Sequence, residues 1–211
     1  MPTFAVPSSV PPRAAPRARA VALDRPPRPP LARLVEQIDD AFSGCARASG
    51  PSREAEFARR VRAALAEAGA MRAWLTDAER AGDAQRYRRH LLAADPLGRY
   101  AIVALVWRAG QASPVHGHRT WCGYTVLEGT LTETLYDWDT AAERAIEARR
   151  HPRAAGAVSF VHADMKGIHR LGHDGDAHDA PAISLHVYGV PGERIATHVN
   201  LLVDVGETAS A

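Results

Sequence analysis

Residues 110–122 read GQASPVHGHRTWC and hold two histidines, His116 and His118, one residue apart and shortly after an apolar run that ends at Trp107. Alternate side chains of a β-strand point to the same face, so the two imidazoles can reach a common point. Two such imidazoles have little reason to lie together without a shared cation, and imidazole is a common metal ligand. The stretch therefore predicts two ligands of a metal site, carried by a strand.

The chain around and beyond this stretch has the pattern of short strands separated by turns. The apolar run 100–107 (YAIVALVW) predicts a buried strand, and Glu128-Gly129-Thr130 predicts a turn. Many short strands with turns between them favour an antiparallel sandwich or barrel over alternating strands and helices. The further strands that we expect are 121–127, 131–138, 145–150, 157–161, 168–171, 182–190 and 195–203.

The first half of the chain predicts a tail and a set of helices. Residues 1–30 hold nine of the fifteen prolines, and proline disfavours both helix and sheet, so we expect a disordered tail there. Apolar residues then recur every three or four positions, which predicts helices at 31–42, at 51–69 with Ser52 as the N-cap, and at 74–81.

Taken together, these patterns predict one domain over 31–211, with helices in 31–82 and a barrel in 85–205.

Composition excludes several classes of function. The chain has 46% hydrophobic and 24% charged residues, as soluble globular proteins do, and no apolar run near the ~20 residues of a membrane span. Two cysteines, Cys45 and Cys122, make no disulfide framework, and the start lacks the apolar core of a secretory signal. Outside residues 1–30 the chain has 21 basic and 23 acidic residues, too few positive charges for a nucleic-acid surface. We expect a cytoplasmic protein with no nucleic-acid or membrane partner.

A third ligand has to come from elsewhere in the chain. His169 is the best candidate, because Gly167 lets the backbone approach closely. His186 alternates with Ser184 and Tyr188, and such a row of hydroxyl, imidazole and phenol favours a hydrogen-bonding relay, with a solvent-facing strand as the alternative. Four other histidines lie in polar segments and are expected to be solvated: His151, His162, His173 and His178.

These motifs resemble the cupins and, among them, the cysteine dioxygenase family of thiol dioxygenases. Residues 110–129 supply the His-x-His and the flanking glycines of the first cupin motif, but Cys122 stands where cupins place a glutamate ligand. The family binds ferrous iron through three histidines without an acidic ligand. The resemblance therefore implies Fe(II) held by His116, His118 and His169.

Further segments extend the resemblance over roughly residues 85 to 200. Residues 128–138 (EGTLTETLYDW), 167–170 (GIHR) and 181–188 (PAISLHVY) follow the family, and Trp107 lies nine residues before His116, as in its mammalian members. The resemblance implies a mostly β fold, a small antiparallel cupin barrel or jelly roll preceded by α-helices. It also implies an enzyme that converts L-cysteine and O2 to cysteine sulfinic acid.

The resemblance assigns roles around the metal. Tyr87 and Arg89 match the pair that holds the substrate carboxylate, and Ser184, His186 and Tyr188 match the catalytic row. Enzymes for cysteine resemble this chain in having arginine at position 89, whereas 3-mercaptopropionate dioxygenases usually carry glutamine there, so the resemblance implies a bacterial member of the arginine type.

Several alternatives stay open. Arg194 lies near Thr197, where 3-mercaptopropionate dioxygenases place an arginine, so that thiol is an alternative substrate. A metal-free or zinc-loaded cupin that binds a small molecule without catalysis is the alternative from a different class. Cys122 is either linked to Tyr188 by a thioether, as in mammalian members, or an ordinary buried thiol. We expect a monomer.

Overall fold

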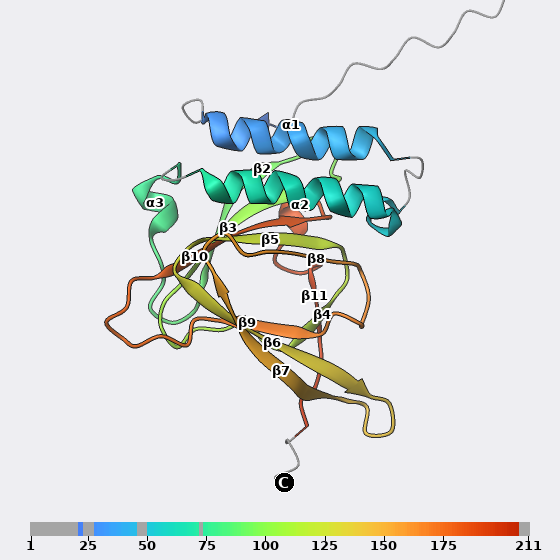
Figure 1. Ribbon diagram of the computed structural model, residues 1–211, viewed down its shortest axis with the longest axis vertical. Helices are drawn as coiled ribbons and strands as arrows, with labels where there is room; N and C mark the ends of the chain where they lie inside the picture. The colour runs from blue at the N-terminus through green and yellow to red at the C-terminus, as the bar shows by residue number, and fades with distance from the viewer. Residues whose placement is uncertain (1–20, 23–27, 46–49, 72–73, 207–211) are drawn as a thin grey trace, which may run out of the picture.

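The computed structural model describes residues 21–22, 28–45, 50–71 and 74–206. Two antiparallel sheets lie opposite each other and form a flattened barrel (Figure 1). The larger sheet contains, in order, β1 (Val21–Ala22), β2 (Arg88–Ala94), β3 (Ala101–Trp107), β10 (Ala182–Tyr188), β5 (Cys122–Glu128) and β8 (Val158–Val161). The smaller sheet contains β11 (Asn200–Leu202), β4 (His116–His118), β9 (His169–Gly172), β6 (Thr130–Asp139) and β7 (Arg144–Ala154). The prediction of a mostly β, antiparallel barrel preceded by helices is confirmed.

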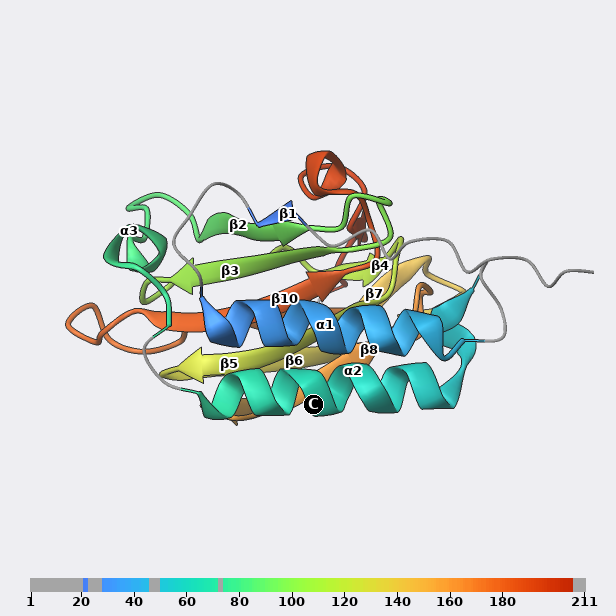
Figure 2. The same cartoon turned by 90° about the horizontal axis from the view of Figure 1, so that it is seen from above.

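Two helices cover the outer face of the larger sheet. α1 (Pro29–Ser43) and α2 (Ala55–Ala70) lie side by side across it and run in opposite directions (Figures 1 and 2). The short elements are α3 (Asp77–Arg80) and the 3₁₀ turns η1 (Pro51–Arg53) and η2 (Gly192–Arg194). None of the helices in the described ranges has the length and apolar character that a membrane crossing requires.

The apolar run in β3 is explained by burial on both faces. Ile102, Ala104 and Val106 pack in the core beneath the helices, whereas Val103 and Leu105 pack in a second core inside the barrel. A strand buried on both faces has a continuous apolar sequence rather than an alternating one. The helix-side core includes a cluster of aromatic rings: Phe42, Phe57, Tyr100, Trp121 and Phe160.

The expectation of a disordered tail over 1–30 is wrong at four positions. Residues 21 and 22 form β1, in which Val21 pairs with Ala94 on the edge strand β2. Pro29 and Pro30 begin α1, where proline fits because the first turn needs no amide donor. Residues 1–20 and 23–27 lie outside the described residues.

Two local predictions are also corrected. Ser52 does not cap the second helix: it lies in η1, and α2 begins three residues later behind Glu54, without a side-chain cap. The strand expected over 195–203 is reduced to β11, because the amides of Thr197 and His198 bond back to the carbonyl of Arg194 and form a helical turn.

Candidate active site

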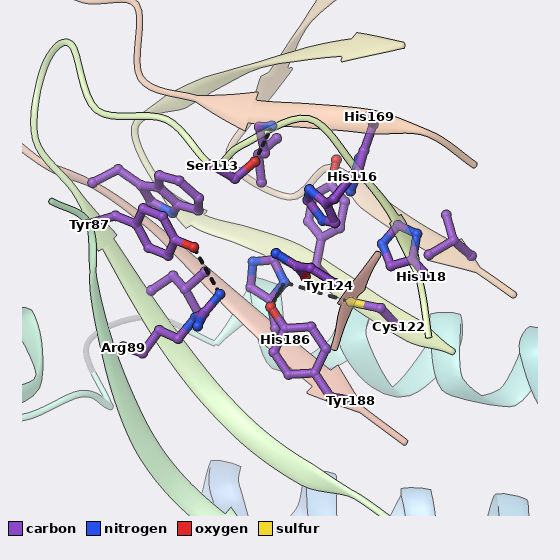
Figure 3. Close-up of a pocket in the computed structure, with 15 residues that line it drawn as sticks. Tyr87, Arg89, Ser113, His116, His118, Cys122, Tyr124, His169, His186 and Tyr188 are labelled. Carbon is purple, nitrogen blue, oxygen red and sulfur yellow. Dashed lines mark hydrogen bonds between the residues drawn. The ribbon is translucent and has the colours of Figure 1, made fainter. Parts of the chain in front are cut away.

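Three histidines meet inside the barrel (Figure 3). His116 and His118 lie on β4, and His169 lies on β9 as the direct register partner of His116. One nitrogen from each ring can be chosen so that all lie within 4.8 Å of one another, and all three side chains are buried. The fold thus brings together the three candidate ligands, although His118 and His169 are 51 positions apart in the sequence.

In His116 and His169, the Nδ1 nitrogen forms a hydrogen bond outside the group of three rings, which leaves Nε2 for a metal. Nδ1 of His116 lies 2.8 Å from the carbonyl oxygen of Pro114, and Nδ1 of His169 lies 2.8 Å from Oε1 of Glu133. A ring that donates from Nδ1 keeps the Nε2 lone pair for a metal ion.

The protonation states of the ligands also fit a metal ion. Burial and the neighbouring His169 lower the pKa of His116 to about 3 and that of His118 to about 2, so both rings are neutral at physiological pH. Neutral imidazoles without a carboxylate suit a divalent transition metal. The residues therefore fit the metal that the sequence implies.

Gly117, between the candidate ligands His116 and His118, has no room for a side chain. A Cβ there would lie 2.9 Å from Sδ of Met165 and 3.2 Å from the carbonyl oxygen of Asp164. That carbonyl accepts a hydrogen bond from the amide of His118, so it cannot move freely. Glycine at this position lets β4 pack closely against the 164–165 segment.

We predict that Gly117→Ala lowers the free energy of unfolding by about 1–2 kcal/mol, because the added methyl group overpacks this contact. For a chain of this size the loss corresponds to a decrease in Tm of roughly 2–8 °C, measurable by thermal unfolding. Gly50→Ala is the control, since its Cβ would meet nothing closer than 3.9 Å. Equal melting of the two variants would contradict the packing argument.

The polar row on β10 forms a connected chain of hydrogen bonds. The indole N–H of Trp107 donates to Oγ of Ser184 at 2.9 Å, Ser184 contacts Nε2 of His186 at 2.9 Å, and Nδ1 of His186 lies 3.1 Å from the hydroxyl of Tyr188. If Ser184 donates to Nε2 and Nδ1–H donates to Tyr188, the phenol keeps its own proton for the pocket. The solvent-facing alternative is wrong, because all three residues of the row are buried.

His186 is held between two tyrosine rings. Tyr124, its register partner on β5, stacks on it with a centroid distance of 5.2 Å, and Tyr188 stacks at 5.5 Å. Burial and the charge of Arg89 keep the pKa of His186 well below its ordinary value, so the ring is neutral. Stacking and hydrogen bonds together fix its orientation.

Arg89 presents a guanidinium to the pocket from β2. Its Nη2 donates to the hydroxyl of Tyr87 at 2.8 Å, and the Tyr87 ring stacks on Trp107 at 4.4 Å. Among the described residues no acidic side chain forms an ion pair with Arg89, and its buried Nε has no hydrogen-bond partner. A half-buried cation with spare donors is suited to an anionic ligand.

The three histidines, Arg89, Tyr87 and most of the polar row line one cavity, and Ser184 lies outside its lining (Figure 3). A second hollow, beside the 195–202 segment, shares Tyr87, Arg89 and Asn200 with it. Arg89 therefore lies where the inner cavity meets the outer hollow.

Cys122 lies directly opposite Tyr188 in the pairing of β5 with β10. Its Sγ is 3.8 Å from Nδ1 of His186, and burial raises the pKa of the thiol, which stays neutral. Cys122 thus lines the cavity beside the polar row rather than ligating with the three histidines.

Sequence reasoning missed Glu133, which contacts the candidate ligand His169, and Tyr124, which stacks on His186. Glu133 is 4% exposed and lies two positions after the buried Leu131 on β6. The signal in the sequence was a carboxylate at a strand position whose side chain faces the barrel interior. His173, expected to be solvated, is buried and accepts from the amide of Gly175. His162 and His178 are exposed as expected.

The chain is similar to known cysteine dioxygenases. The model of the family described as "Cysteine dioxygenase type I" matches residues 56–199. The cysteine dioxygenase type 1 of Danio rerio is 31% identical over 121 residues, which cover 54% of this chain and 57% of that protein. The Rattus norvegicus protein of the same name is 32% identical over 111 residues, 52% of this chain and 54% of that protein. The chain thus spans a little over half the length of these curated relatives.

Among solved structures, the chain is similar to a conserved protein with a double-stranded β-helix domain from Klebsiella pneumoniae. The TM-score is 0.46 at 15% identity, covering 64% of this chain and 93% of that chain. A cupin superfamily protein from Desulfitobacterium hafniense gives 0.41 at 16% identity, with 57% and 93% covered. Because the family match extends over more than half of its residues, the chain belongs to the cysteine dioxygenase type I family.

Proposed function

We propose that this protein is an iron-dependent thiol dioxygenase that converts L-cysteine and O2 to cysteine sulfinic acid. One observation carries the proposal: a single cavity is lined by three histidines that can hold a metal ion and by Arg89, a cation without an acidic partner among the described residues. Such a cavity offers a metal for a thiol and a fork of donors for a carboxylate in the same small molecule.

We assign Fe(II) to His116, His118 and His169. Ferrous iron bound there would supply the redox chemistry that adds both atoms of O2 to the thiol sulfur. Because the three ligands carry no negative charge, the site favours an anionic thiolate as its further ligand.

Arg89 and Tyr87 are assigned to the substrate carboxylate. The guanidinium offers parallel N–H donors that a lysine could not reproduce, and Tyr87 fixes its direction from one side. The stacking of Tyr87 on Trp107 keeps this pair in place.

Tyr188 is assigned as a hydrogen-bond donor to the bound substrate or oxygen. Burial raises the pKa of its phenol well above the ordinary value, so the hydroxyl keeps its proton. Ser184 and His186 orient that proton toward the cavity through the chain of bonds that begins at Trp107.

The residues around Arg89 favour cysteine over 3-mercaptopropionate, and we assign the chain to the bacterial members with arginine at this position. Arg194, the residue that left the alternative open, is exposed in η2 and lines neither the cavity nor the outer hollow. Thr197 does line the outer hollow.

Oxygen uptake by the Fe(II)-loaded protein tests the proposal. We expect consumption of O2 with L-cysteine, slower consumption with 3-mercaptopropionate, and formation of a sulfinic acid. A preference for 3-mercaptopropionate would replace the substrate assignment. Iron-loaded protein that takes up no O2 with either thiol would favour a non-catalytic metal-binding cupin.

A thioether between Cys122 and Tyr188 is a separate prediction. Formation of the bond from sulfur to the phenol ring removes the thiol hydrogen and one ring hydrogen, a two-electron oxidation for which O2 is the oxidant. The direct pairing of the two residues supports it. Mass spectrometry of digests after turnover should find one linked peptide that is two hydrogens lighter than its two parts, and Cys122→Ser should lack it. Two separate unmodified peptides would exclude the link.

We also propose a reducing, cytoplasmic location and a monomeric state. The two cysteines are both free thiols, as a reducing compartment requires.

A further inference from the structure

Glu133 is a buried carboxylate whose position needs an explanation. It lies on β6 facing the barrel interior, two residues after the fully buried Leu131. A charged group is rarely buried unless other groups compensate it, because burial removes its hydration. Glu133 must therefore be held there by specific partners.

The first partner is the metal ligand His169. In the pairing of β6 with β9, Glu133 lies opposite Leu171, so His169 is its diagonal neighbour on the same face. Oε1 of Glu133 accepts a hydrogen bond from Nδ1 of His169 at 2.8 Å. This bond fixes the proton on Nδ1 and leaves Nε2 free for the metal.

The second oxygen of Glu133 faces the edge strand β7. Oε2 lies 3.2 Å from Nε2 of His151, which is its direct register partner, and 3.6 Å from Nε of Arg153. Burial raises the pKa of Glu133, but the bond from His169 and the charges of Arg153 and His151 outweigh burial, and the pKa is lowered overall. Through these contacts the carboxylate bridges the metal ligand to a basic strand.

His169 is the one of the three ligands whose Nδ1 bonds to a carboxylate among the described residues. Nδ1 of His116 donates to a backbone carbonyl, and Nδ1 of His118 has no side-chain partner among the described residues. The stretch that supplies the first two ligands also lacks an acidic side chain, since Cys122 stands in its place. The charge of Glu133 reaches the cavity nonetheless: with burial, it raises the pKa of Cys122 and of Tyr124.

We propose that Glu133 is a positioning residue for the metal centre: it orients His169 through Nδ1 and supplies, one residue removed from the metal, the negative charge that the ligand set lacks. Arg153 and His151 hold this carboxylate from its other side. The proposal rests on the metal site of the proposed function and does not depend on the substrate.

Metal affinity of the full chain with Glu133→Gln tests the proposal. Glutamine keeps the size and an acceptor oxygen but removes the charge, and loss of such a partner typically weakens metal binding by about 10- to 100-fold. We expect a loss in that range for Zn(II) and Co(II), measured by competition with a chromophoric chelator, and an altered Co(II) absorption spectrum. Glu133→Asp, which keeps the charge, should recover part of the affinity.

Glu147→Gln is the matched control. Glu147 lies on the neighbouring β7, is partly buried and contacts Arg150 at 3.5 Å, so its replacement removes an ion pair of the same sheet away from the metal. This variant should bind both metals as the unmodified protein does. A folded Glu133→Gln protein with unchanged affinity and an unchanged Co(II) spectrum would overturn the proposal.

A measurement on the unmodified protein covers the case in which Glu133→Gln fails to fold. In the Zn(II)-loaded protein, the exchangeable ring proton of His169 should sit on Nδ1 and resonate further downfield in the NMR spectrum than that of His116, because its acceptor is a carboxylate. A proton on Nε2 of His169 would overturn the proposal. If affinity falls as expected but no thiol is oxidised, the proposed function fails and this inference stands.

Discussion

His169→Ala is expected to weaken iron binding so far that the protein loses its iron on desalting and, with it, thiol-dependent oxygen uptake. A structural zinc site binds with about 10–16 kcal/mol spread over four ligands, so one imidazole contributes roughly 3 kcal/mol, or a factor on the order of 10² in affinity. The remaining pair on β4 would be left with two nitrogens and an open side facing Glu133. Iron content after desalting, measured by elemental analysis, is the direct readout.

The control for this variant is His178→Ala. His178 is exposed and outside the cavity, so its loss should change neither the iron content nor the rate of oxygen uptake. A His169→Ala protein that retains full iron content would show that the third ligand is a different residue.

Arg89→Gln has the second large expected effect. A hydrogen bond to a charged group contributes about 1.5–3 kcal/mol, so loss of the guanidinium should lower kcat/KM for L-cysteine by roughly 10- to 100-fold. Cysteamine carries the same thiol and amine without a carboxylate, and its turnover should change little. The loss should also be far smaller for 3-mercaptopropionate, because enzymes specific for that thiol resemble this variant in carrying glutamine.

Arg88→Gln is the matched control for Arg89. The two arginines are neighbours on β2, but Arg88 is exposed and lines neither the cavity nor the outer hollow. Its replacement should leave all three rates unchanged. Equal losses for cysteine, cysteamine and 3-mercaptopropionate in Arg89→Gln would contradict the carboxylate assignment and indicate a general structural effect.

The sequence predicted the elements of the barrel because their signals are local. The spacing of His116 and His118 and the apolar run of β3 depend only on neighbouring residues. The prediction of a strand over 195–203 was wrong for its first half, because the buried Ile195 lies at a helical turn and not in a strand. The pairing of residues 21–22 with β2 left no signal within the proline-rich start.

The candidate site was predictable as far as single motifs reach. His169 and the polar row on β10 were predicted from the patterns of their own strands together with the family resemblance. Glu133 was not predicted, because its role depends on His151 and His169, which are 18 and 36 positions away. Only the register of β6 with β7 and β9 brings these residues together. Tyr124 escaped for the same reason, since its contact with His186 spans β5 and β10.

The most direct test of the proposed activity is the fate of O2 in a single turnover of the Fe(II)-loaded protein with L-cysteine. With ¹⁸O2 in unlabelled water, we predict cysteine sulfinic acid in which both sulfinate oxygens carry the label, detected by mass spectrometry of the product. Cystine as the product, or a sulfinic acid with one or no labelled oxygen, would contradict a dioxygenase.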